Sequence, residues 1–262
     1  MELSTYAVAV CLTVPGLLIV SGNPDSCSIS SLMETGYRLK NVSYNFEVKS
    51  SIFSCAATCV MTSICVSFDF DQRRKMCFLN FKDSSNAAHK PESGFLHSDI
   101  TNWSKNISGL CSEESCSSTD MCTTYRNGQA ECQPLLIRDV ENDIRTTYAF
   151  FRLRKAWDDA RVYCQEQGGH LAIIKNAIQN NFLEEVSLAF GNSANLFIGG
   201  LYNKTEGRYK WLDGSPVVYT SWAPDEPDEK EGRCLTMLHP SLWKDKLCTS
   251  ERFFICQFYL FT

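Results

Sequence analysis

The chain has 262 residues with 25 basic and 30 acidic side chains, and therefore a formal net charge of −5. Its length indicates one or two domains, and an acidic chain without a basic stripe argues against nucleic acid as a partner. Fourteen cysteines indicate a disulfide framework in an exported protein, and the four scattered histidines do not stand at zinc-ligand spacing from a cysteine pair.

An N-terminal signal peptide is the first predicted element. Residues 7–20 form an apolar run without a charged side chain. This length is typical of a signal-peptide core and is too short to cross a bilayer as a helix. We therefore expect residues 1–22 to be removed before Asn23 and the mature protein to be secreted and extracellular, with no membrane insertion. A buried N-terminal strand is the alternative.

A helix and a hairpin follow in the first cysteine-rich segment. Residues 51–61 have a helical pattern in which Cys55 and Cys59 lie one turn apart on the same face. Apolar and polar residues then alternate over 66–71 and again over 77–81. This alternation predicts a β-hairpin with one apolar face.

This segment, about residues 23–105, resembles a PAN or apple domain. Two runs carry the resemblance, Cys55-x3-Cys59-x5-Cys65-Val-Ser-Phe-Asp-Phe and Cys77-Phe-Leu-Asn. The resemblance implies a small α+β fold with Cys55 bonded to Cys77 and Cys59 bonded to Cys65, and a role in adhesion to protein or glycan. A disulfide-rich spacer without a ligand of its own is the alternative.

A short linker, residues 111–133, carries four cysteines with the spacing Cys111-x4-Cys116-x5-Cys122-x9-Cys132. This spacing resembles the first two thirds of an EGF-like domain and implies the pairs Cys111 with Cys122 and Cys116 with Cys132. Because so short a segment cannot bury a core, crosslinks must stabilise it, and we expect it to act as a rigid spacer.

Cys27 has no partner in this scheme. An apple domain often ties its first strand to its end, which would pair Cys27 with Cys111 and leave one linker cysteine unpaired instead. Loss of Cys11 with the signal peptide leaves 13 of the 14 cysteines, so one thiol stays unpaired within the chain. The protein then either forms a disulfide-linked dimer through Cys27 or keeps a buried free thiol.

Four sequons predict surface glycosylation in a secretory pathway. Their acceptor residues are Asn41, Asn102, Asn106 and Asn203. The mature protein is therefore expected to be a glycoprotein.

The C-terminal segment, about residues 145–258, begins with two predicted helices. Trp157, Ala160 and Cys164 share one helical stripe, which ends at a glycine pair. The second helix, about residues 177–188, also has an apolar face. Apolar stripes at helical spacing normally pack in a core.

The motifs after these helices resemble a C-type lectin domain in their order and spacing. They are Phe197-Ile-Gly-Gly, Trp211-Leu-Asp-Gly, Ser221-Trp-Ala-Pro-Asp-Glu-Pro-Asp228, Cys234, Trp243-Lys-Asp245, Cys248 and Phe254-Ile-Cys256. The resemblance implies an α+β fold of two helices, two small antiparallel sheets and a long irregular loop. It also implies the pairs Cys164 with Cys256 and Cys234 with Cys248, and the binding of carbohydrate or glycoprotein ligands.

Acidic residues in the long loop are candidate calcium ligands, because calcium takes about six to eight oxygen ligands. In the family the peptide before Pro227 is cis, which turns Glu226 and Asp228 toward one ion, and Asp245 approaches from the neighbouring strand. A sugar then offers two adjacent hydroxyls to the ion. The implied metal ligands are Glu226, Asp228 and Asp245, and the expected ligand-binding set adds Glu231 and Lys244.

Three departures from the family pattern argue against calcium. Both neighbours of Pro227 are acidic, whereas sugar-binding members usually pair one acid with one amide. Gly232 stands where the family has a further glutamate, and Glu231 is one residue out of register. Lys244 replaces the usual asparagine, and an ammonium has no lone pair to give to calcium.

The sequence leaves two kinds of binding open. Either calcium-dependent sugar binding is retained, or Lys244 fills the cation position and the domain is a calcium-independent protein-binding adhesion or structural module. An enzyme is not expected. The chain has no nucleophile elbow, no His-Glu-x-x-His motif and no phosphate loop, and disulfides account for the cysteines that could act as nucleophiles.

Overall fold

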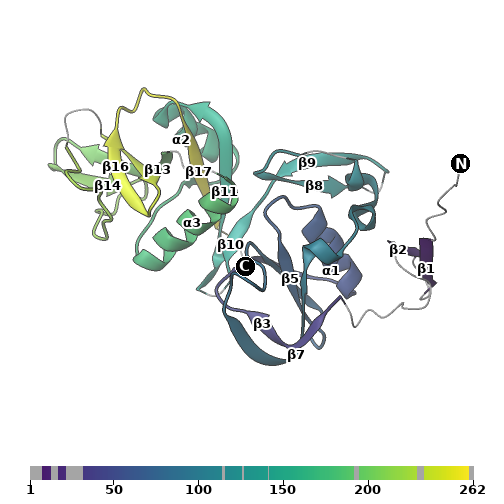
Figure 1. The fold of residues 1–262 in the computed structure, drawn as a ribbon. Coiled ribbons are helices and arrows are strands. Elements are labelled where there is room, and N and C mark those ends of the chain that lie inside the picture. Colours follow the sequence, from purple (N-terminus) through teal and green to yellow (C-terminus); the bar gives the residue numbers. More distant parts are fainter. Residues whose placement is uncertain are drawn as a thin grey trace, which may run out of the picture. The chain divides into compact units, whose positions relative to one another are not determined.

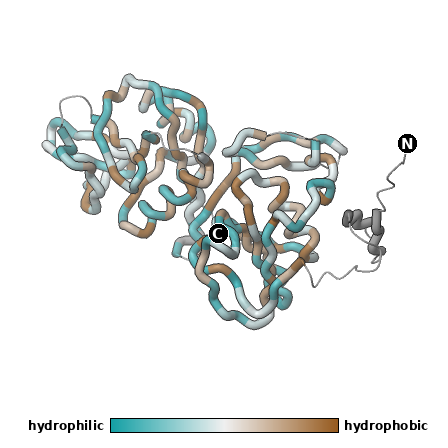
Figure 2. The backbone as a smooth tube through the Cα atoms, in the orientation of Figure 1, coloured by the Kyte–Doolittle hydropathy of each residue, from teal (hydrophilic) through white to brown (hydrophobic). Residues whose placement is uncertain are grey.

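The computed structural model describes residues 8–12, 17–21, 32–113, 116–125, 127–140, 142–191, 195–228 and 233–259. The chain divides into two compact units, Met1–Gln133 and Pro134–Thr262 (Figure 1). Hydrophobic and hydrophilic stretches alternate along the backbone of both units (Figure 2). Among the described residues, no helix has the length and apolar character needed to cross a membrane.

Two short strands lie in the segment where we expect a signal peptide. They are β1 (Val8–Leu12) and β2 (Leu17–Ser21), and they pair in antiparallel fashion. Removal of residues 1–22 stays a prediction.

A five-stranded antiparallel sheet forms the centre of the first unit, in the order β3-β7-β5-β6-β4. Its strands are β3 (Glu34–Leu39), β4 (Ser43–Val48), β5 (Ser67–Asp71), β6 (Met76–Asn80) and β7 (His89–Asp99). Strands β5 and β6 are the two arms of the hairpin that apolar alternation predicts, and they pair from Ser67 with Asn80 to Asp71 with Met76. Two short 3-10 helices follow, η2 (Ile100–Asn102) and η3 (Lys105–Ser112).

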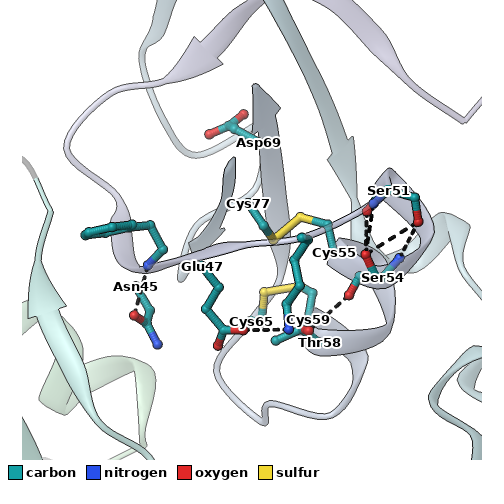
Figure 3. Close-up of a disulfide and its surroundings, with 12 residues drawn as sticks. Asn45, Glu47, Ser51, Ser54, Cys55, Thr58, Cys59, Cys65, Asp69 and Cys77 are labelled. Atoms are coloured by element: carbon teal, nitrogen blue, oxygen red, sulfur yellow. Dashed lines mark hydrogen bonds and ion pairs between the residues drawn. A yellow bond between two sulfur atoms is a disulfide. The ribbon is translucent and has the colours of Figure 1, made fainter. Parts of the chain in front are cut away.

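Helix α1 (Ile52–Val60) packs on β5 and β6 and begins at a capping box. The Ser51 side chain accepts a hydrogen bond from the Ser54 backbone N–H at 3.2 Å, and the Ser54 hydroxyl reaches back to the Ser51 backbone (Figure 3). This reciprocal pairing satisfies N–H groups that a helix start leaves without partners.

Two disulfides crosslink the first unit at α1. They join Cys55 to Cys77 on β6 and Cys59 to Cys65, as the PAN resemblance implies (Figure 3). Because Cys55 and Cys59 lie one turn apart, both sulfur atoms point from the same face of the helix toward the sheet side. The crosslinks therefore hold the helix over the small sheet.

The linker segment is part of the first unit and contacts the end of α1. Its disulfides are Cys111 with Cys122 and Cys116 with Cys132, and its hairpin consists of β8 (Asp120–Thr124) and β9 (Ala130–Pro134). The Cys122 backbone N–H donates to the Met61 carbonyl at 3.2 Å, and the Ser63 hydroxyl donates to the Ser118 carbonyl at 2.6 Å. The hairpin is thus anchored at the end of α1, and bonding of Cys111 to Cys122 excludes a Cys27–Cys111 bond.

A mixed sheet of eight strands forms the second unit, along the path β10-β11-β17-β13-β15-β16, with β12 on β17 and β14 on β13. Its strands are β10 (Ile137–Asp139), β11 (Asp143–Lys155), β12 (His170–Leu171), β13 (Leu196–Asn203), β14 (Arg208–Trp211), β15 (Cys234–Leu238), β16 (Leu242–Lys246) and β17 (Arg252–Tyr259). Its helices are α2 (Trp157–Glu166) and α3 (Ala177–Ala189). Both described units therefore combine helices with mostly antiparallel strands, which is the α+β class.

The core of the second unit lies between α2 and the sheet. Trp157, Ala160 and Cys164 are all buried in it, as their shared helical stripe predicts. The Trp157 indole donates to the Ile198 carbonyl on β13 at 2.9 Å, which satisfies its buried N–H. A disulfide joins Cys164 to Cys256 on β17, and a second one joins Cys234 to Cys248.

Candidate ligand-binding site

A long segment between β14 and β15 carries the predicted site, and it runs mostly without regular strand or helix. Pro216, Pro224 and Pro227 lie in it, and proline cannot donate to a sheet ladder, which favours an irregular path. The loop is anchored to β16 through its backbone. The Trp243 N–H donates to the Ser221 carbonyl at 2.7 Å, and the Ala223 N–H donates to the Trp243 carbonyl at 2.9 Å.

Trp243 is the packing centre beneath this loop. Its side chain is fully buried, and its indole donates to the Asn180 side-chain oxygen on α3 at 2.7 Å. The rings of Trp211 and Trp222 contact it edge-on, with centroids 5.6 and 6.1 Å away. Strand β16 and the loop beside it are therefore held by a rigid aromatic cluster.

Three carboxylates converge where the loop meets β16. Ligand oxygens of Glu226, Asp228 and Asp245 all lie within 4.8 Å of one another. The Glu226–Pro227 peptide is cis, as the resemblance implies. Asp245 is completely buried, and it accepts hydrogen bonds from the Tyr209 hydroxyl at 2.8 Å and from the Asp228 backbone N–H at 3.3 Å. We call these three residues the carboxylate cluster.

Two lysines of β16 flank the carboxylate cluster. The Lys244 ammonium lies 3.9 Å from Glu226 Oε1, and the Lys246 ammonium lies 3.6 Å from the same oxygen. Lys246 did not enter the sequence prediction. The sequence feature that could have identified it is the two-residue side-chain repeat of a strand. This repeat brings Lys244 and Lys246 to the same face, on either side of buried Asp245.

The electrostatic environment of Glu226 is unfavourable to its charged form. Burial, together with the neighbouring Asp245 carboxylate, raises the pKa of Glu226, and the Lys246 ammonium only partly opposes this. Glu226 Oε2 is buried without a hydrogen-bond partner among the described residues. Glu226 therefore has one acceptor oxygen that no described residue satisfies.

The described residues do not form a complete calcium site. Three carboxylates suit a hard cation, but calcium needs about six to eight oxygens, and both Asp245 oxygens already accept hydrogen bonds. Two ammonium groups compete for Glu226, which is the most buried side chain in these ion pairs. The described residues therefore fit calcium less well than the convergence of three carboxylates, taken alone, suggests.

Other predicted residues lie apart from this cluster or outside the described part of the chain. Glu231 and Cys27 fall outside the described residues. The sequon residues Asn41, Asn102 and Asn106 are exposed and Asn203 is partly exposed, which is compatible with glycosylation. Their modification stays a prediction.

Comparison with known proteins agrees with this architecture. The Lectin C-type domain model matches residues 153–258, and the PAN domain model matches residues 33–102. The human C-type lectin domain family 17, member A is 37% identical over 111 residues, and this chain spans only 29% of its length. The mouse scavenger receptor C-type lectin carbohydrate-recognition domain aligns with 26% identity and a TM-score of 0.43, over 47% of this chain and 94% of that domain.

A relative matched over most of its length identifies the family. Perlucin from Haliotis laevigata is 31% identical over 118 residues, which are 43% of this chain and 76% of perlucin. Residues 153–258, which the Lectin C-type domain model matches, lie within the second unit, as do the two predicted helices, the long loop and the carboxylate cluster. The chain therefore belongs to the C-type lectin family and carries a PAN domain ahead of its lectin domain.

Proposed function

We propose that this protein is a secreted, non-catalytic recognition protein that binds a glycan or glycoprotein through the carboxylate cluster without needing calcium. The observation that carries the proposal is the convergence of acceptors and donors at one place. Three carboxylates lie within 4.8 Å of one another. Two ammonium groups lie 3.6 and 3.9 Å from Glu226 Oε1.

This arrangement suits the hydroxyl groups of a sugar. A hydroxyl donates one hydrogen bond and accepts others, so it can bridge a carboxylate and an ammonium. The Lys244 and Lys246 ammonium groups replace the amide donor that is missing on both sides of Pro227. They also supply positive charge that a divalent ion would otherwise bring.

Glycan binding tests the proposal directly. The secreted protein is applied to a glycan array with calcium and with a chelator, and we expect the same binding pattern in both. Glu226→Gln combined with Asp228→Asn is expected to reduce binding at least tenfold, because it removes two charged acceptors. Glu166→Gln on exposed α2 is the matched control and is expected to bind normally. Normal binding by the double variant would refute recognition at this cluster.

Calcium-dependent sugar binding is a second candidate, because Glu226 has a buried oxygen without a partner and a raised pKa. Both features would be relieved by a cation. Loss of glycan binding in the chelator, with the unchanged protein, would favour this candidate over the first.

Thermal stability distinguishes the two candidates. We expect calcium in the millimolar range to change the Tm of the native protein by less than about a degree. Lys244→Asn combined with Lys246→Asn is expected to gain several degrees from calcium, since a ligand at a hundredfold excess over Kd stabilises by about 2.7 kcal/mol. Lys244→Asn alone is expected to gain less, because Lys246 stays 3.6 Å from Glu226. Calorimetry measures all three.

Lys175→Asn is the matched control for these calcium measurements. It removes one exposed lysine that pairs with Asp213, away from the carboxylate cluster. It is expected to respond to calcium as the native protein does. A gain of several degrees by the native protein would contradict the calcium-independent proposal.

A disulfide-linked dimer through Cys27 is a separate prediction. Among the described residues, six disulfides use twelve of the 14 cysteines of the chain, and these do not include Cys11 or Cys27. If residues 1–22 are removed, Cys27 has no partner in its own chain. If Cys27 bridges two chains, non-reducing electrophoresis shows a dimer that Cys27→Ser abolishes. A monomer with one alkylatable thiol would reject the bridge.

A further inference from the structure

Three basic residues stand where β11 ends and β17 begins. They are Arg154 and Lys155 on β11 and Arg252 on β17. Lys155 and Arg252 stand opposite each other in the antiparallel register. We call these three residues the basic patch. It shares no residue with the carboxylate cluster.

An aromatic ring supports each cation of the basic patch. The distances from the charged group to the ring centroid are 5.1 Å for Arg154 on Phe253, 5.4 Å for Lys155 on Tyr163 and 6.0 Å for Arg252 on Phe197. Contacts of this kind stabilise a cation at a ring face and restrict its motion. The three charges are therefore held in place before a ligand arrives.

The basic patch forms no ion pair among the described residues. No ion pair is formed by Arg154, Lys155 or Arg252 in the part of the chain that the structure describes, and Arg252 Nε is buried without a hydrogen-bond partner. Burial and then the repulsion of Arg154 lower the pKa of Arg252. Like charges are thus held together without compensation.

Several other cations of the same unit are paired. Arg208 and Lys210 both bind Glu206, and Arg161 binds Asp158. These paired cations provide matched controls for the basic patch.

We propose that the basic patch is an anion-binding site that takes the sulfate or carboxylate groups of an acidic polysaccharide. A guanidinium presents a planar fork of donors that matches the two oxygens of such a group, and an adjacent ammonium adds a compact charge. An anion between Arg154 and Arg252 would replace their mutual repulsion by attraction.

A polysaccharide fits this surface better than a nucleic acid. Single-stranded nucleic acids bind by stacking bases on aromatic rings, whereas each ring in the patch already carries a cation. Anionic groups spaced along a sugar chain need only a small local patch.

Binding of heparin tests the proposal, with the full chain immobilised in the presence of a chelator. We expect the native protein to bind heparin and not a non-sulfated polysaccharide of similar length. Arg154→Gln is expected to weaken heparin binding about tenfold, and Arg154→Gln combined with Arg252→Gln to weaken it about a hundredfold. The affinity of the native protein is expected to fall as salt rises, and less steeply in the double variant.

Matched control variants distinguish binding at the basic patch from non-specific attraction to positive charge. Arg208→Gln removes the same charge from a residue paired with Glu206 and is expected to change heparin affinity less than twofold. Arg154 is exposed, so its single substitution keeps the test valid even if substitution of Arg252 disturbs folding. Equal losses in Arg154→Gln and Arg208→Gln would overturn the proposal, as would equal binding of an oligonucleotide.

The heparin test does not depend on the function proposed for the carboxylate cluster. Glu226→Gln combined with Asp228→Asn is expected to keep heparin binding while losing the array ligands. Loss of heparin binding in that variant would also overturn the proposal that the basic patch is a site separate from the carboxylate cluster.

Discussion

Replacing Cys164 and Cys256 together by alanine is expected to lower the free energy of unfolding of the lectin domain by about 4–5 kcal/mol. The disulfide joins residues 92 positions apart, and a crosslink that closes a long loop restricts the unfolded chain most. Both cysteines are completely buried in the core beside Trp157. Thermal unfolding of the full chain, followed by calorimetry, measures the change.

The second lectin disulfide is the matched comparison. Cys234 and Cys248 are 14 positions apart, and their joint replacement by alanine is expected to cost about 3 kcal/mol. The long-loop variant should therefore be destabilised by at least about 1 kcal/mol more. If the Cys234 and Cys248 variant is destabilised more, then loss of packing, and not restriction of the unfolded chain, determines the loss of stability.

Replacing His97 by leucine is expected to destabilise the PAN domain by about 3–5 kcal/mol, because it removes the cationic partner of the buried Asp69 carboxylate, which then keeps only the neutral donors of Asn80 and the Leu39 backbone. His97 Nδ1 lies 2.7 Å from Asp69 Oδ1, and His97 Nε2 lies 3.2 Å from Asp99 Oδ1. The side chains of His97 and Asp69 are almost completely buried. Because both ring nitrogens face carboxylate oxygens, the geometry favours the doubly protonated ring.

His89→Leu on the same strand is the control for His97→Leu. His89 is exposed and stacks on Tyr37, and its loss is expected to cost less than about 1 kcal/mol. Urea unfolding together with hydrogen exchange of residues in β5 and β7 measures both variants. Similar losses would mean that the His97 pair contributes nothing beyond ordinary packing.

The pair formed by His97 and Asp69 also makes the stability of the PAN domain depend on pH. Burial favours the neutral ring, but the hydrogen bonds and charges of Asp69 and Asp99 outweigh it and raise the pKa of His97 above its ordinary value. The Tyr37 ring, 5.4 Å away, also faces His97.

The direction of the pH effect follows from that raised pKa. A raised folded-state pKa gives a stabilisation that is complete below the ordinary pKa of about 6.5 and is lost as pH rises through the folded-state value. We expect the free energy of unfolding to fall by at most about 1.4 kcal/mol per pH unit over that range, and His97→Leu to abolish this dependence. If the free energy of unfolding of His97→Leu depends on pH as steeply as that of the native protein, other titratable groups cause the effect.

The sequence by itself determined the elements whose patterns are local. Helices α1 and α2 lie where apolar side chains and cysteines recur at helical spacing, and β5 and β6 lie where apolar and polar residues alternate. Each pattern repeats within one element, so it can be recognised without knowledge of the rest of the fold. Family resemblance added the disulfide pairs and the long loop, which spacing alone leaves open.

Only the tertiary structure decided the environment of the charged side chains. Lys246 reaches Glu226 because strand β16 runs beside the long loop, and Asp245 is buried because Tyr209 from β14 lies over it. His97 meets Asp69 because β7 and β5 pair in one particular register. These contacts join residues far apart in the chain. Strand register and loop path, which no local pattern specifies, set the charges and hydrogen bonds of the site.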